Sequence, residues 1–245
     1  MKLPIRDLPL YSVYLEASDI TVKYRPHTVK EEQILNMASL SDSESEKLEA
    51  VFQICENCID YDIYKLYPAE IEYMFMKIKA CSDSPKVPVI YTVDPEIDKD
   101  GKNIHENCPD EISSTFDINT DVEVIIDKSM NDYAKRNKDG SWIIDLENDI
   151  KIQIRVKPLI NVGHDAIYEL LESIIDEKTD EVLYKDTDFN REEIVEWVEK
   201  LPSSTFKNFN KFMDRSPTCV ANLKFKCKCG KVFEEKEYGV VRFLV

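Results

Sequence analysis

Residues 20–35, Ile-Thr-Val-Lys-Tyr-Arg-Pro-His-Thr-Val-Lys-Glu-Glu-Gln-Ile-Leu, contain the end of a strand and the beginning of a helix. Apolar and polar residues alternate over residues 20–24, as in a half-buried strand, and Pro26 ends that pattern. Thr28 and Glu31 then have the spacing of a capping box, in which a hydroxyl and a carboxylate each bind the other's backbone amide. The stretch therefore predicts a change from strand to helix near residue 28.

The same two kinds of pattern continue on both sides of this stretch. Residues 10–15 alternate in the same way and predict an N-terminal β-hairpin with the strand at 20–24. Further on, Ser43 and Pro68 are helix-start signals, and each precedes apolar residues at helical spacing. We therefore expect three short helices after the hairpin, and we assign residues 1–83 to one N-terminal region.

The middle of the chain, residues 84–160, has the composition of a β-rich module. Residues 94–111 inside it combine charges with Pro95, Gly101 and Pro109, which is typical of a loop. Short β-branched or alternating runs surround that loop. We expect strands at residues 86–93, 122–126, 142–146 and 151–156.

Helical patterns return in residues 161–245, which we expect to form a compact unit with residues 1–83. Apolar residues share one helical face over 167–175, and the predicted helices that follow lie at 190–201 and 204–213. The chain closes with a predicted hairpin that joins residues 223–226 to Val240–Val245 through Cys229-Gly230. The predicted fold class is α+β, with helical elements flanking a β-rich middle region and β-hairpins at the N- and C-terminal ends.

Charge and composition exclude several classes of function. The chain has 245 residues, and its 32 basic and 48 acidic residues give a formal net charge of −16. This balance argues against binding to nucleic acid or to anionic lipid, because both require a basic surface. No apolar run approaches the roughly 20 residues of a membrane-spanning helix, and no secretory signal is visible. Seven unevenly spaced cysteines indicate reduced thiols in a cytosol.

The sequence contains no recognisable set of catalytic residues. There is no glycine-rich phosphate loop and no nucleophile elbow, and His27, His105 and His164 are far apart in the sequence. Cys55 and Cys58 have the CxxC spacing of a redox pair or half a zinc site, but Cys55 continues the apolar stripe of a helix, which favours buried structural thiols. We predict no enzymatic activity and no small-molecule substrate.

A second cysteine pair leaves an alternative open. Cys227 and Cys229 precede a glycine at a hairpin tip, like half a zinc knuckle one residue too short. The missing ligands would have to come from His105, Cys108 or Cys219, and His105 with Cys108 would complete a set of four. Nothing in the sequence brings these loops together, so a plain polar turn is favoured and we predict no cofactor. The alternative function is a small zinc-stabilised domain with a regulatory or nucleic-acid-related role.

Several segments, in a consistent order, resemble the T4-type bacteriophage baseplate hub protein family. The string from Val22 to Leu35 is similar to the family's opening, in which an aromatic-basic-proline step precedes a "VKEE" helix. Cys58-Ile59-Asp60 resembles its "NCI" step, and residues 68–80 resemble its "DIEYLFLKIRA" helix. The late helices and the closing hairpin follow in the same order, although Leu244-Val245 replaces an aromatic-glycine finish.

The resemblance implies an assembly role in the tail baseplate of a contractile-tailed phage, without enzymatic activity. The expected partners are other phage baseplate or tail proteins, met in the host cytoplasm during assembly or in the virion tail baseplate. We expect binding surfaces at β-edges or aromatic-bearing helices, because interface cores are rich in aromatic residues and Met. The candidate partner-binding residues are Tyr73, Phe75, Met76 and Phe243. Core packing is the alternative for the first three, and we expect at least half of the block at residues 73–76 to be buried. A permanent virion subunit and a transient assembly factor both fit.

Overall fold

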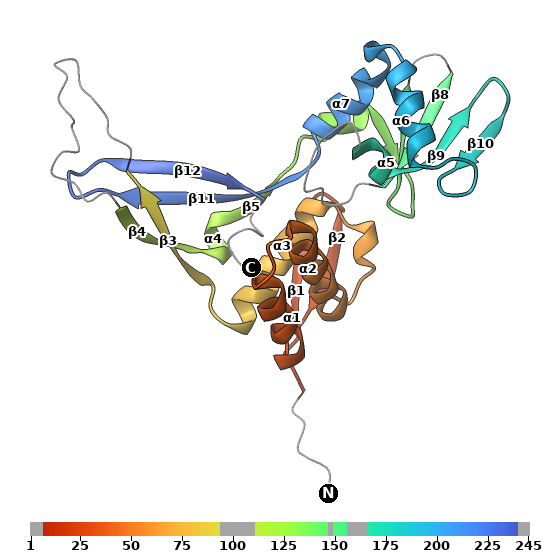
Figure 1. Ribbon diagram of the computed structural model, residues 1–245. Coiled ribbons are helices and arrows are strands. Elements are labelled where there is room, and N and C mark those ends of the chain that lie inside the picture. Colours follow the sequence, from red (N-terminus) through yellow and green to blue (C-terminus); the bar gives the residue numbers. More distant parts are fainter. Residues whose placement is uncertain (1–6, 94–110, 147–148, 156–165, 240–245) are drawn as a thin grey trace, which may run out of the picture.

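The computed structural model describes residues 7–93, 111–146, 149–155 and 166–239. It confirms a mixed α+β fold. The N-terminal hairpin and the first helices form a central body, from which two β-containing arms diverge like the limbs of a V (Figure 1). The strands of the arms belong to separate small sheets rather than to one continuous sheet.

The body contains the predicted N-terminal hairpin and helices. Strands β1 and β2 pair antiparallel, with Asp19 in the turn at a positive φ of 55°. Strand β2 also reaches the end of the second helix, where the Asp60 amide donates to the Lys23 carbonyl at 2.8 Å. The elements of the body are β1 (Tyr11–Leu15), β2 (Ile20–Tyr24), α1 (Val29–Ser39), α2 (Glu44–Cys58), the 3-10 helix η1 (Ile63–Lys65) and α3 (Pro68–Ser82).

Helix α1 begins at the predicted capping box and adds a buried ion pair to it. The Glu31 carboxylate accepts the Thr28 amide at 2.7 Å and lies 3.1 Å from Arg25 Nη2. Burial alone raises the pKa of Glu31, but the hydrogen bonds from Arg25 and Thr28 outweigh it and lower the pKa to about 2. The guanidinium of Arg25 also donates to the Asn57 carbonyl at 3.0 Å, so it ties the start of α1 to the end of α2.

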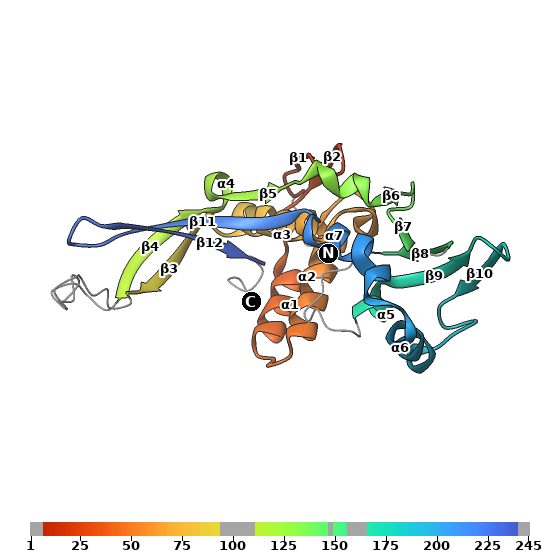
Figure 2. The same cartoon turned by 90° about the horizontal axis from the view of Figure 1, so that it is seen from above.

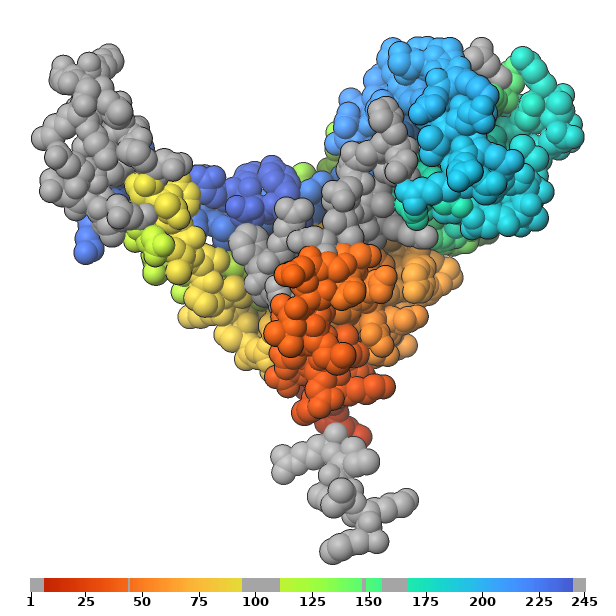
Figure 3. Space-filling model, viewed as in Figure 1, coloured from red at the N-terminus to blue at the C-terminus, as the bar shows by residue number. Residues whose placement is uncertain are grey.

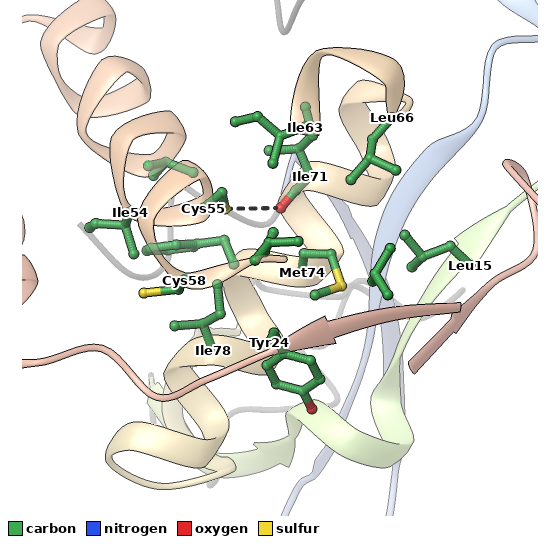
Figure 4. Close-up of a cluster of buried hydrophobic side chains, with 14 of the residues drawn as sticks. Leu15, Tyr24, Ile54, Cys55, Cys58, Ile63, Leu66, Ile71, Met74 and Ile78 are labelled. Carbon is green, nitrogen blue, oxygen red and sulfur yellow. Dashed lines mark hydrogen bonds between the residues drawn. The ribbon is translucent and has the colours of Figure 1, made fainter. Parts of the chain in front are cut away.

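The core of the body fills the space between the hairpin, α2 and α3 (Figure 4). Leu15 and Tyr24 from the hairpin meet Ile54 and Cys55 of α2 and Met74 of α3. Cys55 lies inside this cluster, where its thiol contacts the Ile71 carbonyl at 3.7 Å. The amphipathic spacing of α2 places these residues on one face, and this is the face that the core covers.

The first arm consists of two β-hairpins and a short strand, β5, that pairs with one of them. Tyr91 of one hairpin stacks on Phe225 of the other at 4.9 Å between ring centroids, and Ser114 Oγ donates to the Lys224 carbonyl at 2.9 Å. Strand β5 pairs with β11 across nearly a hundred residues of sequence, with Val122 opposite Ala221. The elements of this arm are β3 (Lys86–Thr92), β4 (Glu111–Asp117), α4 (Ile118–Asp121), β5 (Val122–Ile125), β11 (Thr218–Lys226) and β12 (Val232–Tyr238).

The second arm is an antiparallel sheet with strand order β10-β9-β8-β7-β6, covered by helices. Trp142 is at the centre of its core, 5.0 Å from the ring of Phe212 and 5.7 Å from that of Tyr67. The capping box at Asn190 and Glu193, predicted as a helix start, is present. The elements are η2 (Lys128–Asp132), β6 (Ala134–Arg136), β7 (Trp142–Leu146), β8 (Ile150–Ile154), α5 (Ala166–Leu170), β9 (Leu171–Asp176), β10 (Glu181–Tyr184), α6 (Arg191–Lys200), η3 (Ser203–Phe206) and α7 (Lys207–Asp214).

The structure corrects one predicted helix and shows which strand completes the closing hairpin. The helix expected over 167–175 stops at Leu170, and β9 follows at once, with Ile174 opposite Ile152 of β8. A short apolar run with β-branched residues has no decisive period, and pairing with two neighbouring strands selects the strand. The closing hairpin is present, and the strand that pairs with β11 in it is β12; the residues predicted for that strand, Val240–Val245, lie outside the described part of the chain.

The predicted three-part organisation also differs from the observed sheets. The middle region 84–160 divides near η2, because β3, β4 and β5 pack in the first arm and β6, β7 and β8 in the second. The region 161–245 contributes to both arms in turn and does not form a compact unit with residues 1–83. Strand partners distant in sequence cannot be read from local patterns, and these partners decide the division.

Helix α3 and the segment before it join the three parts. One face of α3 packs in the body through Met74 and Ile78, and another packs in the first arm through Ala69 and Met76. The second arm meets the body at η1. Gly140, in the β6–β7 turn, has a φ of +86°, and a Cβ added to it would lie only 2.9 Å from the Cα of Lys65. Any side chain there would press on the backbone of η1, so the joint requires glycine.

Candidate partner-binding surfaces

The aromatic and Met block predicted on α3 lies mostly in the interior. Phe75 is 1% exposed and Met76 is 0% exposed, because the body covers one face of α3 and the first arm covers the other. The expectation that these two side chains contact a partner is therefore corrected: in this structure they are core residues. Tyr73 is half-buried, with the Lys77 ammonium 5.0 Å from its ring centroid, and Phe243 lies outside the described residues.

An apolar face that the sequence argument missed lies on α1. Val29, Met37 and Leu40 are 69%, 75% and 87% exposed, respectively. Their spacing of eight and three residues places them on one side of the helix, which Leu40 continues as the C-cap residue after Ser39, away from the buried Leu35 and Ala38. Figure 3 shows this part of the body, in orange, at the surface. We call Val29, Met37 and Leu40 the α1 face.

A second exposed group belongs to the N-terminal hairpin. Leu10, Tyr11 and Tyr14 are exposed, and the Tyr14 hydroxyl donates to the Asp19 carboxylate at 2.5 Å. Figure 2 shows the hairpin on one side of α3 and α1 on the other, so the two exposed groups belong to elements on different sides of the body. The body therefore presents apolar side chains on two separate surfaces.

The edge strand β10 is apolar and exposed, and the turn that follows it binds its last backbone groups. Val182, Leu183 and Tyr184 are exposed at the edge of the five-stranded sheet. The Tyr184 amide donates to the Asp188 carboxylate at 2.8 Å, and the Tyr184 carbonyl accepts the Asp188 amide at 2.9 Å. Because the following turn occupies these backbone groups, β10 offers little room for an added strand. The α1 face has no such obstruction among the described residues.

The CxxC cysteines are buried thiols, as favoured from the sequence. Cys55 and Cys58 are both buried in the core of the body. Burial raises the pKa of Cys58 to about 11 and raises the pKa of Cys55 further, so neither is a thiolate at neutral pH. The arrangement does not provide the reactive thiolate that a redox pair requires.

The second cysteine pair lies at the β11–β12 turn, where Cys227 is buried and Cys229 is exposed. The other two candidate zinc ligands, His105 and Cys108, fall outside the described residues. Within the described ranges, no three His, Cys, Asp or Glu side chains are grouped closely enough to hold a metal ion. Nothing in this part of the chain supports the zinc alternative.

The remaining observations concern membrane spanning and the comparison of the sequence with known proteins. None of the helices that the structure describes is long and apolar enough to span a bilayer. No curated protein and no solved structure matched the chain. In contrast, the model of the family described as T4 bacteriophage base plate protein matches residues 8–244. This match covers both arms and the body, and the chain therefore belongs to the T4 bacteriophage base plate protein family.

Proposed function

We propose that the protein acts in assembly of the baseplate hub of a contractile-tailed phage, as a hub component or as an assembly chaperone, through protein–protein contacts. Membership of the base plate protein family places it among phage baseplate proteins, and the resemblance of residues 22–35 and 58–80 to the hub family favours the hub. Its partners are then other baseplate or tail proteins, met in the host cytoplasm and, for a permanent subunit, retained in the virion.

The observation that carries a binding role is the α1 face. A Met or Leu side chain contributes about 1.5–3 kcal/mol when it passes from full exposure to full burial. Met37 and Leu40 are the most exposed of the large apolar side chains described, and they lie on one side of one helix. A partner that covers them gains this free energy, whereas the isolated subunit does not.

We infer further that the protein has no catalytic step and no cofactor. Its two buried CxxC thiols are held protonated, and the described residues offer no cluster of metal ligands. The net charge of −16 disfavours contact with nucleic acid. Metal analysis of the purified protein tests this inference, and stoichiometric zinc lost on replacing Cys227 and Cys229 would overturn it.

The function is tested in phage carrying a double change on the α1 face, M37D with L40D. The expected result is a folded protein that no longer enters hub intermediates, because two carboxylates cannot be buried against an apolar partner. The control is S39D, which adds one carboxylate instead of two, at an exposed position on the same helix but outside the α1 face. Equal incorporation of both variants would exclude the α1 face as the docking surface.

Mass spectrometry of purified virions beside assembly intermediates separates the two roles. A stoichiometric amount in finished tails identifies a hub subunit and excludes the chaperone. Presence in intermediates alone identifies an assembly chaperone. Absence from both would contradict the proposed function.

A further inference from the structure

A cationic pocket lies where the second arm joins the body. It has a volume of about 270 Å³ and opens between the β6–β7 turn, η1 and the turn of the N-terminal hairpin. Lys65, Arg136 and Lys138 are among its lining residues, together with Asn137, and no Asp or Glu of the described residues is. Three cations around one small pocket are unexpected on a chain with a formal net charge of −16.

Two carboxylates near the pocket, one next to its lining residues in the sequence and one hydrogen-bonded to Ser18, are engaged elsewhere. Asp139 accepts the Ser141 amide at 3.0 Å and lies 3.4 Å from Arg155 Nη2. Glu70 is buried and accepts the amides of Ser18 and Tyr67 at 2.9 and 3.2 Å. Neither group is therefore directed at the pocket cations.

Asp62 is the exception, and its contribution is small. Its carboxylate lies 3.4 Å from Lys65 Nζ, in a pair whose side chains are both exposed by more than a third. An exposed pair of this kind is weak and screened by salt. Lys65 can therefore exchange Asp62 for another anion at little cost.

Arg136 is held in place by groups that leave its charge without a counter-ion. Its guanidinium lies 4.3 Å from the ring centroid of Tyr67, and Nη2 donates to the Lys65 carbonyl at 2.6 Å. Within the described part of the chain it forms no ion pair. A guanidinium has five N–H donors in a planar fork that fits a carboxylate. Because Tyr67 and Lys65 fix this fork, an incoming carboxylate loses little side-chain entropy on binding it.

We propose that this pocket binds a carboxylate side chain from an acidic segment of a partner protein. The inference rests on the proposed function, because it gives the baseplate protein a second, charge-selective contact beside the apolar α1 face. The pocket is smaller than the roughly 300–1,000 Å³ of ordinary small-molecule and cofactor sites. Tyr61 lines it and is exposed, as aromatic residues at protein interfaces are. The net charge of −16 opposes every anion, and it opposes a run of nucleic-acid phosphates more strongly than a single carboxylate.

The test is an NMR titration of the purified, isotope-labelled full chain with a blocked tetraglutamate peptide. The expected result is a saturable shift of the Asn137, Lys138 and Gly140 amides with a dissociation constant in the millimolar range, which weakens as salt is added. A blocked tetraglutamine peptide controls for the backbone, and inorganic phosphate tests for a general anion site.

Substitutions identify the cations that bind the peptide. K138A removes an exposed charge and should weaken peptide binding about three-fold without unfolding the protein. The matched control K135A, at an exposed position of β6 outside the pocket, should leave binding unchanged. R136K keeps the charge but removes the planar fork, and should weaken peptide binding more than K138A does.

Three outcomes would overturn the proposal: no saturable shift at these amides, binding of phosphate without binding of the peptide, or equal effects of K138A and K135A. The test uses purified protein, so its failure is separable from failure of the proposed function. Loss of the pocket interaction with normal incorporation into hub intermediates would reject the pocket alone. Peptide binding by a protein absent from both virions and intermediates would reject the assembly role alone.

Discussion

Replacing Glu31 by Gln should remove a defined, pH-dependent part of the stability of the body. The pKa of Glu31 is lowered from 4.5 to about 2 in the folded protein, because hydrogen bonds from Arg25 and Thr28 outweigh the effect of burial. This difference corresponds to about 3 kcal/mol of unfolding free energy at neutral pH. Gln keeps an acceptor for the Thr28 amide but leaves Arg25 without its carboxylate, so E31Q should lose most of this amount.

The sign of the pH dependence follows from the direction of the shift. A carboxylate with a lower pKa in the folded state stabilises it above pH 4.5, and this contribution falls as the pH approaches 2. In the wild-type protein about 2 kcal/mol should disappear between about pH 7 and pH 3. In E31Q that component is absent, so the stabilities of the two proteins should converge as the pH falls.

Urea unfolding followed by circular dichroism over a pH series measures both quantities. The matched control is E32Q, which removes a neighbouring carboxylate that is exposed on the same first turn of α1. E32Q should change stability by less than about 1 kcal/mol, as expected for a charge near a helix N-terminus. If E31Q and the wild-type protein kept a constant difference in stability over the whole series, the assignment of the stabilisation to the ionised Glu31 would be refuted.

Three further predictions concern the core, the joint and the thiols. F212A should destabilise the second arm by about 3–5 kcal/mol in urea unfolding, because it empties a fully buried site against Trp142. G140A should lower the free energy of unfolding by about 2 kcal/mol or more, and G230A by less. Both glycines have a positive φ, but only a Cβ at position 140 would collide with backbone atoms. Equal losses of stability in thermal unfolding would contradict the close contact between Gly140 and Lys65. Cys55 should resist alkylation at neutral pH until the protein unfolds, as peptide mapping would show.

Local chemistry determines how much of the fold could be predicted. The hairpin and the helices of the body were predictable because Pro26, Thr28 and Pro68 act on their immediate neighbours. Strand β12 was misplaced because Glu234, Lys236 and other charges occupy both of its faces, so it lacks the alternation that marks a strand. Its partner β11, rather than its own side-chain pattern, makes it a strand.

The binding residues were harder to predict for the same reason. On sequence alone, Phe75 and Met76 exceed what one helix face can bury, and the excess indicates exposure. The structure buries both: Phe75 packs in the core of the body, and Met76 packs against β11, more than a hundred residues later, on the second face of α3. The α1 face did leave a signal in the sequence, since Met37 and Leu40 lie off the stripe that contains Leu35 and Ala38. The cationic pocket left none, since it joins three distant turns.

The position of α3 has a consequence for how the molecule unfolds. Because its two faces belong to different cores, the body and the first arm cannot lose their packing independently, and they should open as one cooperative unit. Among the described residues, the second arm meets the body around Tyr67, η1 and Gly140, outside the two cores that α3 joins, and it can open separately. Amide hydrogens of α3 should therefore exchange with solvent more slowly than those of β9. For the same reason, a partner that pulls on the second arm should unfold that arm before the body and the first arm open.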